Sequence, residues 1–143
     1  MYTQSVSSMM EKRKLMLVPR ETTVFEAARR MAKCNYGAVL VVDGETLLGI
    51  FTERDLVIRV VARKLDPAVT TLAEVMTSAP KTIDAHESFG KAMLVMHEGD
   101  FRHLPVIDQG KVVGLVSSRM ALDPELEEFA FETYRRRSLM ASH

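Results

Sequence analysis

Residues 38–55 read AVLVVDGETLLGIFTERD, and the same pattern returns 65 positions later as HLPVIDQGKVVGLVSSRM, residues 103–120. The match continues without a gap over Val18–Leu56 and Ile83–Ala121. The identical pairs are Ala27/Ala92, Met31/Met96, Val41/Val106, Asp43/Asp108, Gly49/Gly114 and Arg54/Arg119. Conservative substitutions keep the same register, so the turn, strand and helix signals stay aligned. An internal duplication of this kind indicates two copies of one structural unit.

Each copy has the pattern of a helix, a β-hairpin and a further helix. Apolar residues recur at i, i+3, i+4 and i+7 from Val24 in the first copy and from Phe89 in the second, which is the spacing of one helix face. Thr23 and Ser88 stand directly before these stripes, where N-caps are expected. Apolar runs on either side of an Asp-Gly or Asp-Gln-Gly turn predict the two hairpins. The further helix is clear at 56–62 and less distinct in the second copy.

Short extended segments at 15–18 and 81–83 open the two copies. A unit of about 55 residues is marginally stable alone, so we expect the two to pack into one body. The chain is divided into an N-terminal arm (1–14), unit 1 (15–68), unit 2 (69–122) and a C-terminal helix and tail (123–143).

Composition narrows the class of protein. The chain has 143 residues, 47% of them apolar, and a formal net charge of zero. This excludes a disordered polymer and disfavours a nucleic-acid partner. No apolar run approaches the roughly 18 residues of a membrane-spanning helix, and the first residues lack a secretory signal pattern. The single cysteine, Cys34, fits a reducing compartment, so we expect a cytoplasmic protein without a membrane partner.

The segment 49–55, Gly-Ile-Phe-Thr-Glu-Arg-Asp, ends a predicted strand and begins a helix. The hydroxyl of Thr52, the guanidinium of Arg54 and the free amides of the helix start could take a phosphate, while Asp55 could accept hydrogen bonds from a ribose. The same Thr-x-x-Asp spacing also fits a capping box that only begins the helix. The residues alone leave both interpretations open.

No other pattern points to catalysis or to a metal. Cys34 lies between a predicted helix and a predicted strand, where a cysteine is more often a packing residue than a nucleophile, and His86, His97 and His103 lack metal-ligand spacing. Glycine-rich loops for mono- or dinucleotides do not occur. We therefore expect no enzyme, no catalytic residue, no metal and no required cofactor.

With its two units, the chain resembles the tandem cystathionine-β-synthase (CBS) domain pair over about residues 6–122. The resemblance is carried by the Gly-x-x-Thr-x-x-Asp motif at 49–55, the linker Leu72–Thr77 and the strand Arg102–Asp108. It implies an α/β (α+β) fold of two βαββα units related by an internal pseudo-twofold, called a Bateman module. In that family, modules commonly pair as a disc, and adenosine-containing ligands bind in clefts between the units and regulate an attached or partner protein.

The resemblance also implies site residues. An intact cleft uses the Thr and Asp of one unit's motif with a Thr from the opening strand of the other unit, and here these are Thr52, Asp55 and Thr82. The corresponding residues of the second cleft are Ser117, Met120 and Leu17. Because the second cleft lacks the Asp and the Thr, we expect it to bind nucleotide weakly or not at all. The implied ligand-binding set is Thr52, Arg54, Asp55, Thr82, Ile83, Arg102, His103, Pro105, Ser117 and Arg119.

The leading functional hypothesis is a stand-alone regulatory module that binds an adenosine nucleotide and acts on an unidentified protein. AMP, ADP and ATP are the candidate regulatory ligands, with NAD and S-adenosylmethionine as further ones. The alternative is a dimeric protein-interaction module with a vestigial cleft. A nucleic-acid binder that uses Arg135–Arg137 is a third, disfavoured class.

We also expect a homodimer. The apolar residues of the helix after Asp55 are Leu56, Val57, Val60 and Val61, and those of the C-terminal helix are Leu126, Phe129 and Ala130. Two solvent-exposed apolar faces of this kind are rare in monomeric proteins. A twofold contact between these helices would cover them.

Overall fold

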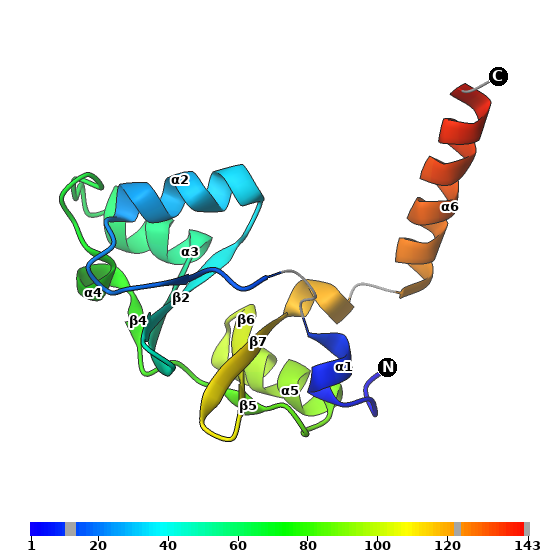
Figure 1. Ribbon diagram of the computed structural model, residues 1–143, viewed down its shortest axis with the longest axis horizontal. Coiled ribbons are helices and arrows are strands. Elements are labelled where there is room, and N and C mark those ends of the chain that lie inside the picture. The colour runs from blue at the N-terminus through cyan, green and yellow to red at the C-terminus, as the bar shows by residue number, and fades with distance from the viewer. Residues whose placement is uncertain (11–13, 122–123, 142–143) are drawn as a thin grey trace.

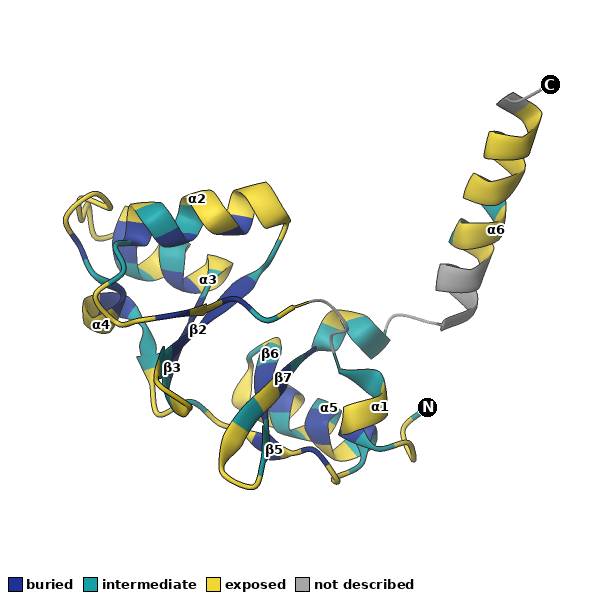
Figure 2. Ribbon diagram, in the orientation of Figure 1, coloured by how far each residue is buried: buried dark blue, intermediate teal, exposed yellow. Residues whose placement is uncertain are grey.

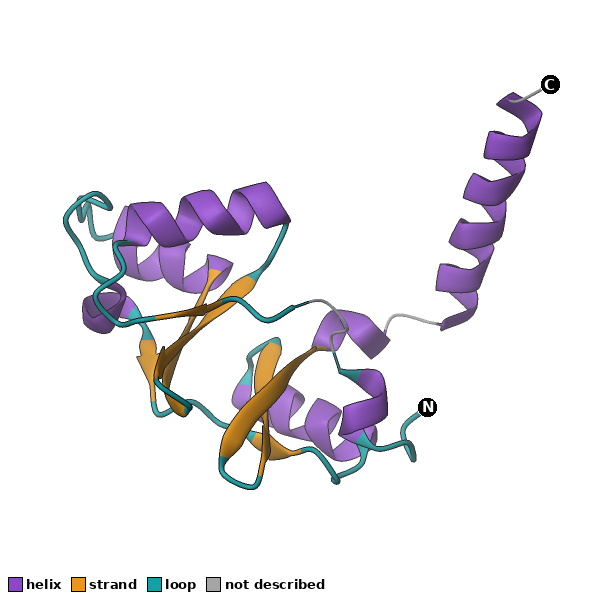
Figure 3. Ribbon diagram, viewed as in Figure 1, coloured by secondary structure: helices purple, strands orange, loops and turns teal. Residues whose placement is uncertain are grey.

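The computed structural model describes residues 1–10, 14–121 and 124–141 (Figure 1). In chain order the elements are α1 (Val6–Met9), β1 (Leu17–Val18), α2 (Val24–Cys34), β2 (Ala38–Asp43), β3 (Thr46–Thr52), α3 (Glu53–Asp55), the π-helix η1 (Leu56–Val61), α4 (Leu72–Val75), β4 (Thr77–Ser78), β5 (Ile83–Asp84), α5 (Phe89–Gly99), β6 (His103–Asp108), β7 (Lys111–Ser117), the 3-10 turn η2 (Ser118–Ala121) and α6 (Pro124–Ala141). This mixed set of helices and strands confirms the predicted α+β class, with one sheet in each unit (Figure 3).

The two sheets share a three-stranded arrangement, to which the first sheet adds β4, antiparallel to β3. In the first, β1 is parallel to β2, and β2 and β3 form the predicted antiparallel hairpin. In the second, β5 is parallel to β6, and β6 and β7 form the equivalent hairpin. The register shifts between Val41 and Val42 in one hairpin and between Val106 and Ile107 in the other. Because these positions correspond in the duplication, the irregularity belongs to the repeated unit.

The first helix of each unit begins and ends as its copy does. The Thr23 side chain accepts a hydrogen bond from the Glu26 amide at 3.2 Å, and Ser88 accepts one from the Lys91 amide at 3.1 Å. Asn35 ends α2 and Asp100 ends α5. Both have a left-handed backbone, with φ of 56° and 54°, which Asn and Asp tolerate better than most residues. The predicted N-caps are confirmed.

The short helices α1 and α4 each pack into the core of the unit whose first strand they do not precede: α1 into the second unit and α4 into the first. Leu72 and Val75 of α4 lie in the core of the first unit, together with Phe51. Val6 of α1 lies in the core of the second unit, where it packs with Phe89. The packing therefore crosses the division at residue 68, because each core is completed by the segment that precedes the other unit's first strand (Figure 2).

A third apolar cluster joins the two sheets. Its buried members are Ala38, Leu40 and Ile50, and the residues packed against them are Leu15, Leu47, Val112 and Leu115. The strands β3 and β7 are in contact across this junction. Since β3 and β7 each lead into a helical turn, this contact places the two turns and their polar residues near one boundary between the units.

The segments after the hairpins differ between the copies. After β3, the turn α3 continues into η1. After β7, the described chain forms only η2, a four-residue 3-10 turn. Asp55 at the third position of α3 completes a capping box, whereas Met120 at the corresponding position has no oxygen to do so. Beyond η2, α6 extends away from both units (Figure 1).

Candidate functional site

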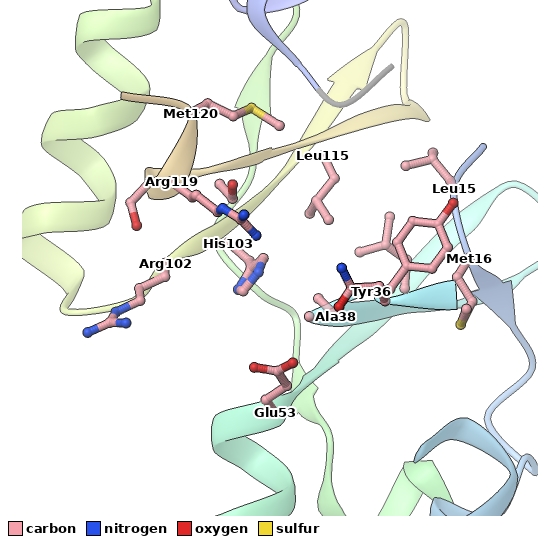
Figure 4. A pocket seen from close by; sticks show the side chains of 15 residues that line it. Leu15, Met16, Tyr36, Ala38, Glu53, Arg102, His103, Leu115, Arg119 and Met120 are labelled. Carbon is pink, nitrogen blue, oxygen red and sulfur yellow. The ribbon is translucent and has the colours of Figure 1, made fainter. Parts of the chain in front are cut away.

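Two pockets lie at the boundary between the units. The first has a volume of about 950 Å³ and includes Thr52, Arg54 and Asp55 from the first unit, with Lys81 and Phe101 from the second. The second has a volume of about 480 Å³ and is shown in Figure 4. It has the converse composition: residues of η2 and β7 from the second unit face Leu15, Tyr36 and Ala38 of the first. Each pocket is therefore lined by the motif of one unit and by residues of the other unit, as expected for the two clefts.

Thr52 and Asp55 form the predicted capping box. The Thr52 amide donates to Asp55 Oδ2 at 3.0 Å, and the Asp55 amide donates to Thr52 Oγ1 at 3.2 Å. The Thr52 hydroxyl lies 3.1 Å from the same carboxylate oxygen. The structural interpretation of this motif is thus correct. It does not exclude a ligand, because Oδ1 is outside the box and the pocket is lined by both residues.

The remaining oxygen of Asp55 has two further neighbours. Thr77 Oγ1 and Arg59 Nε each lie 3.5 Å from Oδ1, longer than a good hydrogen bond. Arg59 is held by the carbonyl of Met76, to which its Nη1 donates at 2.9 Å. Asp55 is only 6% exposed, so this cation compensates the buried carboxylate. The same pair of residues would orient Oδ1 for a ligand.

Arg54 connects the two units. Its Nη1 donates to the backbone carbonyl of Asp100 at 2.9 Å, and its Nη2 lies 3.6 Å from the Asp100 carboxylate. Asp100 ends α5, so the contact joins the start of α3 to the end of α5. Arg54 lines the first pocket with most of its side chain exposed.

Three residues line both pockets: Glu53, Arg102 and His103. We call them the shared wall. His103 is half-buried, and burial lowers the pKa of its imidazole below the usual 6.5. The Glu53 carboxylate opposes that lowering, the Arg102 cation adds to it, and Asp55 opposes it more weakly. Burial therefore favours the neutral form of the His103 imidazole, and the nearby Glu53 carboxylate partly offsets this effect by favouring the charged form.

Two predicted site residues are buried within the second unit. Ile83 of β5 is 6% exposed in the second apolar core, and Pro105 is buried in β6, where it pairs with Leu115. Thr82 is exposed immediately before β5. None of the three is among the residues that line either pocket, although Lys81, the neighbour of Thr82, lines the first.

The second pocket contains the other predicted residues. Ser117, Arg119 and Met120 line it together, and Arg119 and Met120 point into it from η2 in Figure 4. Leu17, which corresponds to Thr82, is not among its lining residues, and its place near the opening strand is taken by Leu15 and Met16. The pocket thus has a cationic side and an apolar side.

Several residues of the site were not predicted. Arg59 reaches Asp55 because it follows by four positions on the same helical turn, a spacing that could have been read from the sequence. Lys81 and Phe101 enter the first pocket from the other unit, and Glu53 enters both pockets. Their positions depend on how the units pack, so no local pattern marks them.

None of the helices in the described ranges is long and apolar enough to cross a membrane.

Comparison with known proteins gives two matches to one family. The CBS domain family model matches residues 6–62 and 72–123. The CBS domain-containing protein CBSCBSPB5 of Arabidopsis thaliana is 40% identical over 104 residues, which are 72% of this chain. The chain spans only 19% of that protein's length. The two segments that the family model matches correspond to the two copies of the internal duplication.

Solved structures show the same arrangement. A protein with CBS domains from Burkholderia ambifaria is 33% identical, with a TM-score of 0.77, and the match covers 82% of this chain and 90% of that one. A CBS domain protein from Pyrobaculum aerophilum, solved as a complex with AMP, is 25% identical, with a TM-score of 0.77. That match covers 90% of this chain and 99% of the other.

Proposed function

Since this chain belongs to the CBS domain family, we propose that it is a regulatory module that binds an adenosine-containing nucleotide in the first pocket and acts on a partner protein. The single observation that carries this proposal is the meeting of Thr52 and Asp55 with cations of both units around one pocket. The similarity to a protein solved with AMP supports the choice of ligand.

The first pocket has complementary surfaces for each part of such a ligand. Ile50, Ile58 and Phe101 give it an apolar lining suited to a purine. Oδ1 of Asp55 accepts from a ribose hydroxyl, and Thr52 with Arg54 takes the phosphate nearest the ribose. Thr82, which the resemblance implies near the base, follows directly after the lining residues Pro80 and Lys81. A ligand in this place touches both units at once.

Because the ligand contacts both units, its binding changes how the chain meets a partner protein. A ligand that bridges Asp55 and Lys81 favours the arrangement in which the units are held together over any in which they separate. Such a shift in population changes the outer surfaces that a partner protein meets. Regulation requires no reaction on the ligand, so we assign no catalytic residue and no cofactor.

A homodimer belongs to the same proposal. Val57 and Val61 of η1 are 59% and 66% exposed, and Ile58 beside them is also exposed. Val60, which the sequence analysis assigned to this face, is in fact buried in the first core, and Leu56 packs against that core. On η1 the dimer surface is therefore narrower than expected and consists of Val57 and Val61, because Ile58 lines the first pocket. On α6, Phe129 is 69% exposed, and Leu126 lies outside the residues whose side chains the structure describes.

The alternative function is an interaction module with a vestigial cleft. One observation favours it: both oxygens of Asp55 already have neighbours within the protein, and the cap alone explains the motif. In that case the residues of the first pocket begin a helix and bind nothing. The two functions differ in what removal of the Asp55 carboxylate does.

Titration calorimetry with AMP, ADP, ATP, NAD and S-adenosylmethionine separates them. We expect wild-type protein to bind at least one of these ligands and Asp55→Ala to weaken that binding about 10- to 100-fold. The matched control is Glu74→Ala, which removes the carboxylate of the other capping box, formed with Thr71 outside the pocket. Both substitutions lower stability by about 0.5–2 kcal/mol, but only the first changes affinity. Equal affinity in folded Asp55→Ala, or no binding of any ligand, would favour the alternative.

A further inference from the structure

The N-terminal arm completes the second unit, and its helix α1 lies beside α5 (Figure 1). Val6 of α1 has no exposed surface and packs in the second core with Phe89. The Gln4 carbonyl accepts a hydrogen bond from the Phe89 amide at 2.7 Å, and the Tyr2 carbonyl accepts one from the Gly90 amide at 2.9 Å. Because the first amides of a helix have no partner within it, the arm both fills the core and satisfies the start of α5.

Residues 67–75 do the same for the first unit, so the two segments can be compared directly. Leu72 of α4 has no exposed surface and packs in the first core. The Thr70 carbonyl accepts a hydrogen bond from the Val24 amide at 2.9 Å, at the start of α2. Each unit is therefore completed by a short helix that contributes to its core and by carbonyls that bind the first amides of its first long helix.

The two cores differ in their methionines. The methionines of the second core and its border are Met1, Met9, Met10, Met93, Met96 and Met120. Met96 is buried, and the others are partly exposed. Those of the first core are Met16, Met31 and Met76, of which Met16 and Met31 are buried. Thioethers that solvent reaches are therefore concentrated at the second core.

Two of these thioethers attach the end of α1 to the second unit. Met9 is the last residue of α1, and Met10 follows it. The Met10 sulfur occupies the space that a side chain at Gly114 of β7 would need. Met120 packs against the same core and also points into the second pocket (Figure 4). A polar atom added to the Met10 sulfur would lie at a contact that now fits an apolar group, which is unfavourable without a hydrogen-bond partner.

We propose that Met9 and Met10 form a site of oxidation by a peroxide, and that their sulfoxides release the N-terminal arm from the second unit. The thioether sulfur attacks one oxygen of hydrogen peroxide, so that a sulfur–oxygen bond forms and the oxygen–oxygen bond breaks. The sulfur loses two electrons, and the departing hydroxide takes the proton of the transferred hydroxyl to leave as water. Each sulfoxide is more polar than the thioether, and reductases can reverse its formation.

The first unit should keep its segment under the same treatment. Val75, which is buried, ends α4 where Met9 ends α1. Met76 lies over Gly49 as Met10 lies over Gly114, but its carbonyl also accepts a 2.9 Å hydrogen bond from Arg59 Nη1. The residues after Met76 form β4, which pairs with β3. These additional bonds hold α4 even if the Met76 sulfur is oxidised.

The test is hydrogen exchange measured by mass spectrometry on the full chain before and after treatment with hydrogen peroxide, with peptide mapping of the sulfoxides. Once Met9 and Met10 are oxidised, we expect amides of the arm and of the start of α5 to exchange about 10-fold faster or more. The corresponding amides of α4 and of the start of α2 should be unchanged, which makes the first unit an internal control.

Two variants carry the comparison. Met9→Leu together with Met10→Leu keeps apolar side chains of similar size but leaves no sulfur to oxidise, so most of the acceleration should disappear. Met140→Leu is the control, because Met140 is 77% exposed on α6, which extends away from both units. Its sulfur should oxidise early, and its substitution should leave the acceleration unchanged.

If the double variant fails to fold, wild-type protein decides alone, since reduction by methionine sulfoxide reductases should restore slow exchange. Complete oxidation of Met9 and Met10 without faster exchange would overturn the inference. Equal acceleration in the folded double variant, or oxidation of the buried Met16 and Met31 before Met9 and Met10, would overturn it too. No nucleotide takes part in these measurements, so the proposed function stands or fails separately.

Discussion

Arg54 at the start of α3 donates a 2.9 Å hydrogen bond to the backbone carbonyl of Asp100 at the end of α5. The acceptor is the main chain, so the link does not depend on the Asp100 carboxylate, which is 91% exposed. The contact ties the part of the first pocket that Arg54 lines to the second unit. The duplication does not repeat this contact. Arg119, which corresponds to Arg54, points into the second pocket instead (Figure 4).

Substitutions at this pair should therefore be unequal. Asp100→Asn keeps the left-handed backbone and the carbonyl, and it should change the free energy of unfolding by less than about 0.5 kcal/mol. Arg54→Ala removes the hydrogen bond and should cost about 0.5–1.5 kcal/mol. Urea unfolding followed by circular dichroism measures both. An equal loss in the two variants would show that the side-chain ion pair, not the main-chain contact, carries the link.

The duplicated glycines give a matched pair of stability predictions. A Cβ on Gly49 would lie 2.8 Å from the Thr77 carbonyl, and it would also meet the Met76 side chain. The three atoms nearest to a Cβ on Gly114 all belong to the flexible Met10 side chain. Gly49→Ala should cost about 1–3 kcal/mol, because backbone of β4 must move, and Gly114→Ala should cost less. Denaturant titration of both variants checks the order, and a larger loss at Gly114 would contradict it.

Stability should depend on the protonation of His103. Burial lowers the pKa of this imidazole in the folded chain, so between that pKa and about 6.5 the unfolded chain binds more protons. The contribution of His103 to stability is therefore fully present above about pH 6.5 and is lost as the pH falls toward the folded-state pKa. We expect His103→Gln to reduce the drop in melting temperature between pH 7.5 and pH 5.5. An unchanged drop in the variant would assign the pH dependence to other groups.

The dimer surface can be tested by charge. Val57→Lys together with Val61→Lys places two cations on the exposed face of η1, where a twofold contact would bring them against their own copies. We expect wild-type protein to have twice the chain mass by light scattering at micromolar concentration and this variant to have the chain mass. Phe25→Lys on α2 is the control, since Phe25 is similarly exposed at 56% on another helix. A monomeric wild-type protein would refute the prediction directly.

Local pattern accounts for much of the fold. The helices at 24–34 and 89–99 follow from the apolar spacing and from Thr23 and Ser88, whose caps involve neighbours only three residues away. The hairpins follow from turns between apolar runs, and the capping box of Thr52 and Asp55 follows from their spacing. These features depend on residues close in the chain, so one copy of the repeat suffices to predict the other.

The candidate site is less local. Thr52, Arg54, Asp55, Arg102 and His103 were predicted and do line one pocket. Ile83 and Pro105 were also predicted but are buried: Ile83 lies in the core of the second unit, whereas Pro105 is on the other face of β6, paired with Leu115 of the cluster between the sheets. Arg59 and Lys81 were not predicted. Arg59 stands four positions after Asp55, a local spacing, whereas only the packing of the units brings Lys81 to the pocket.

Spacing and neighbouring residues are enough to predict the duplication, the order of elements in each unit, the two hairpins and the capped start of α3. The packing of the units is needed to show that α1 and α4 each lie in the core of the other unit, that Arg54 contacts Asp100, and that Glu53, Arg102 and His103 line both pockets. Those relationships join residues far apart in the chain. They depend on the burial of apolar residues from distant segments, in the two cores that α1 and α4 complete and in the cluster around Leu40 and Ile50 between the sheets.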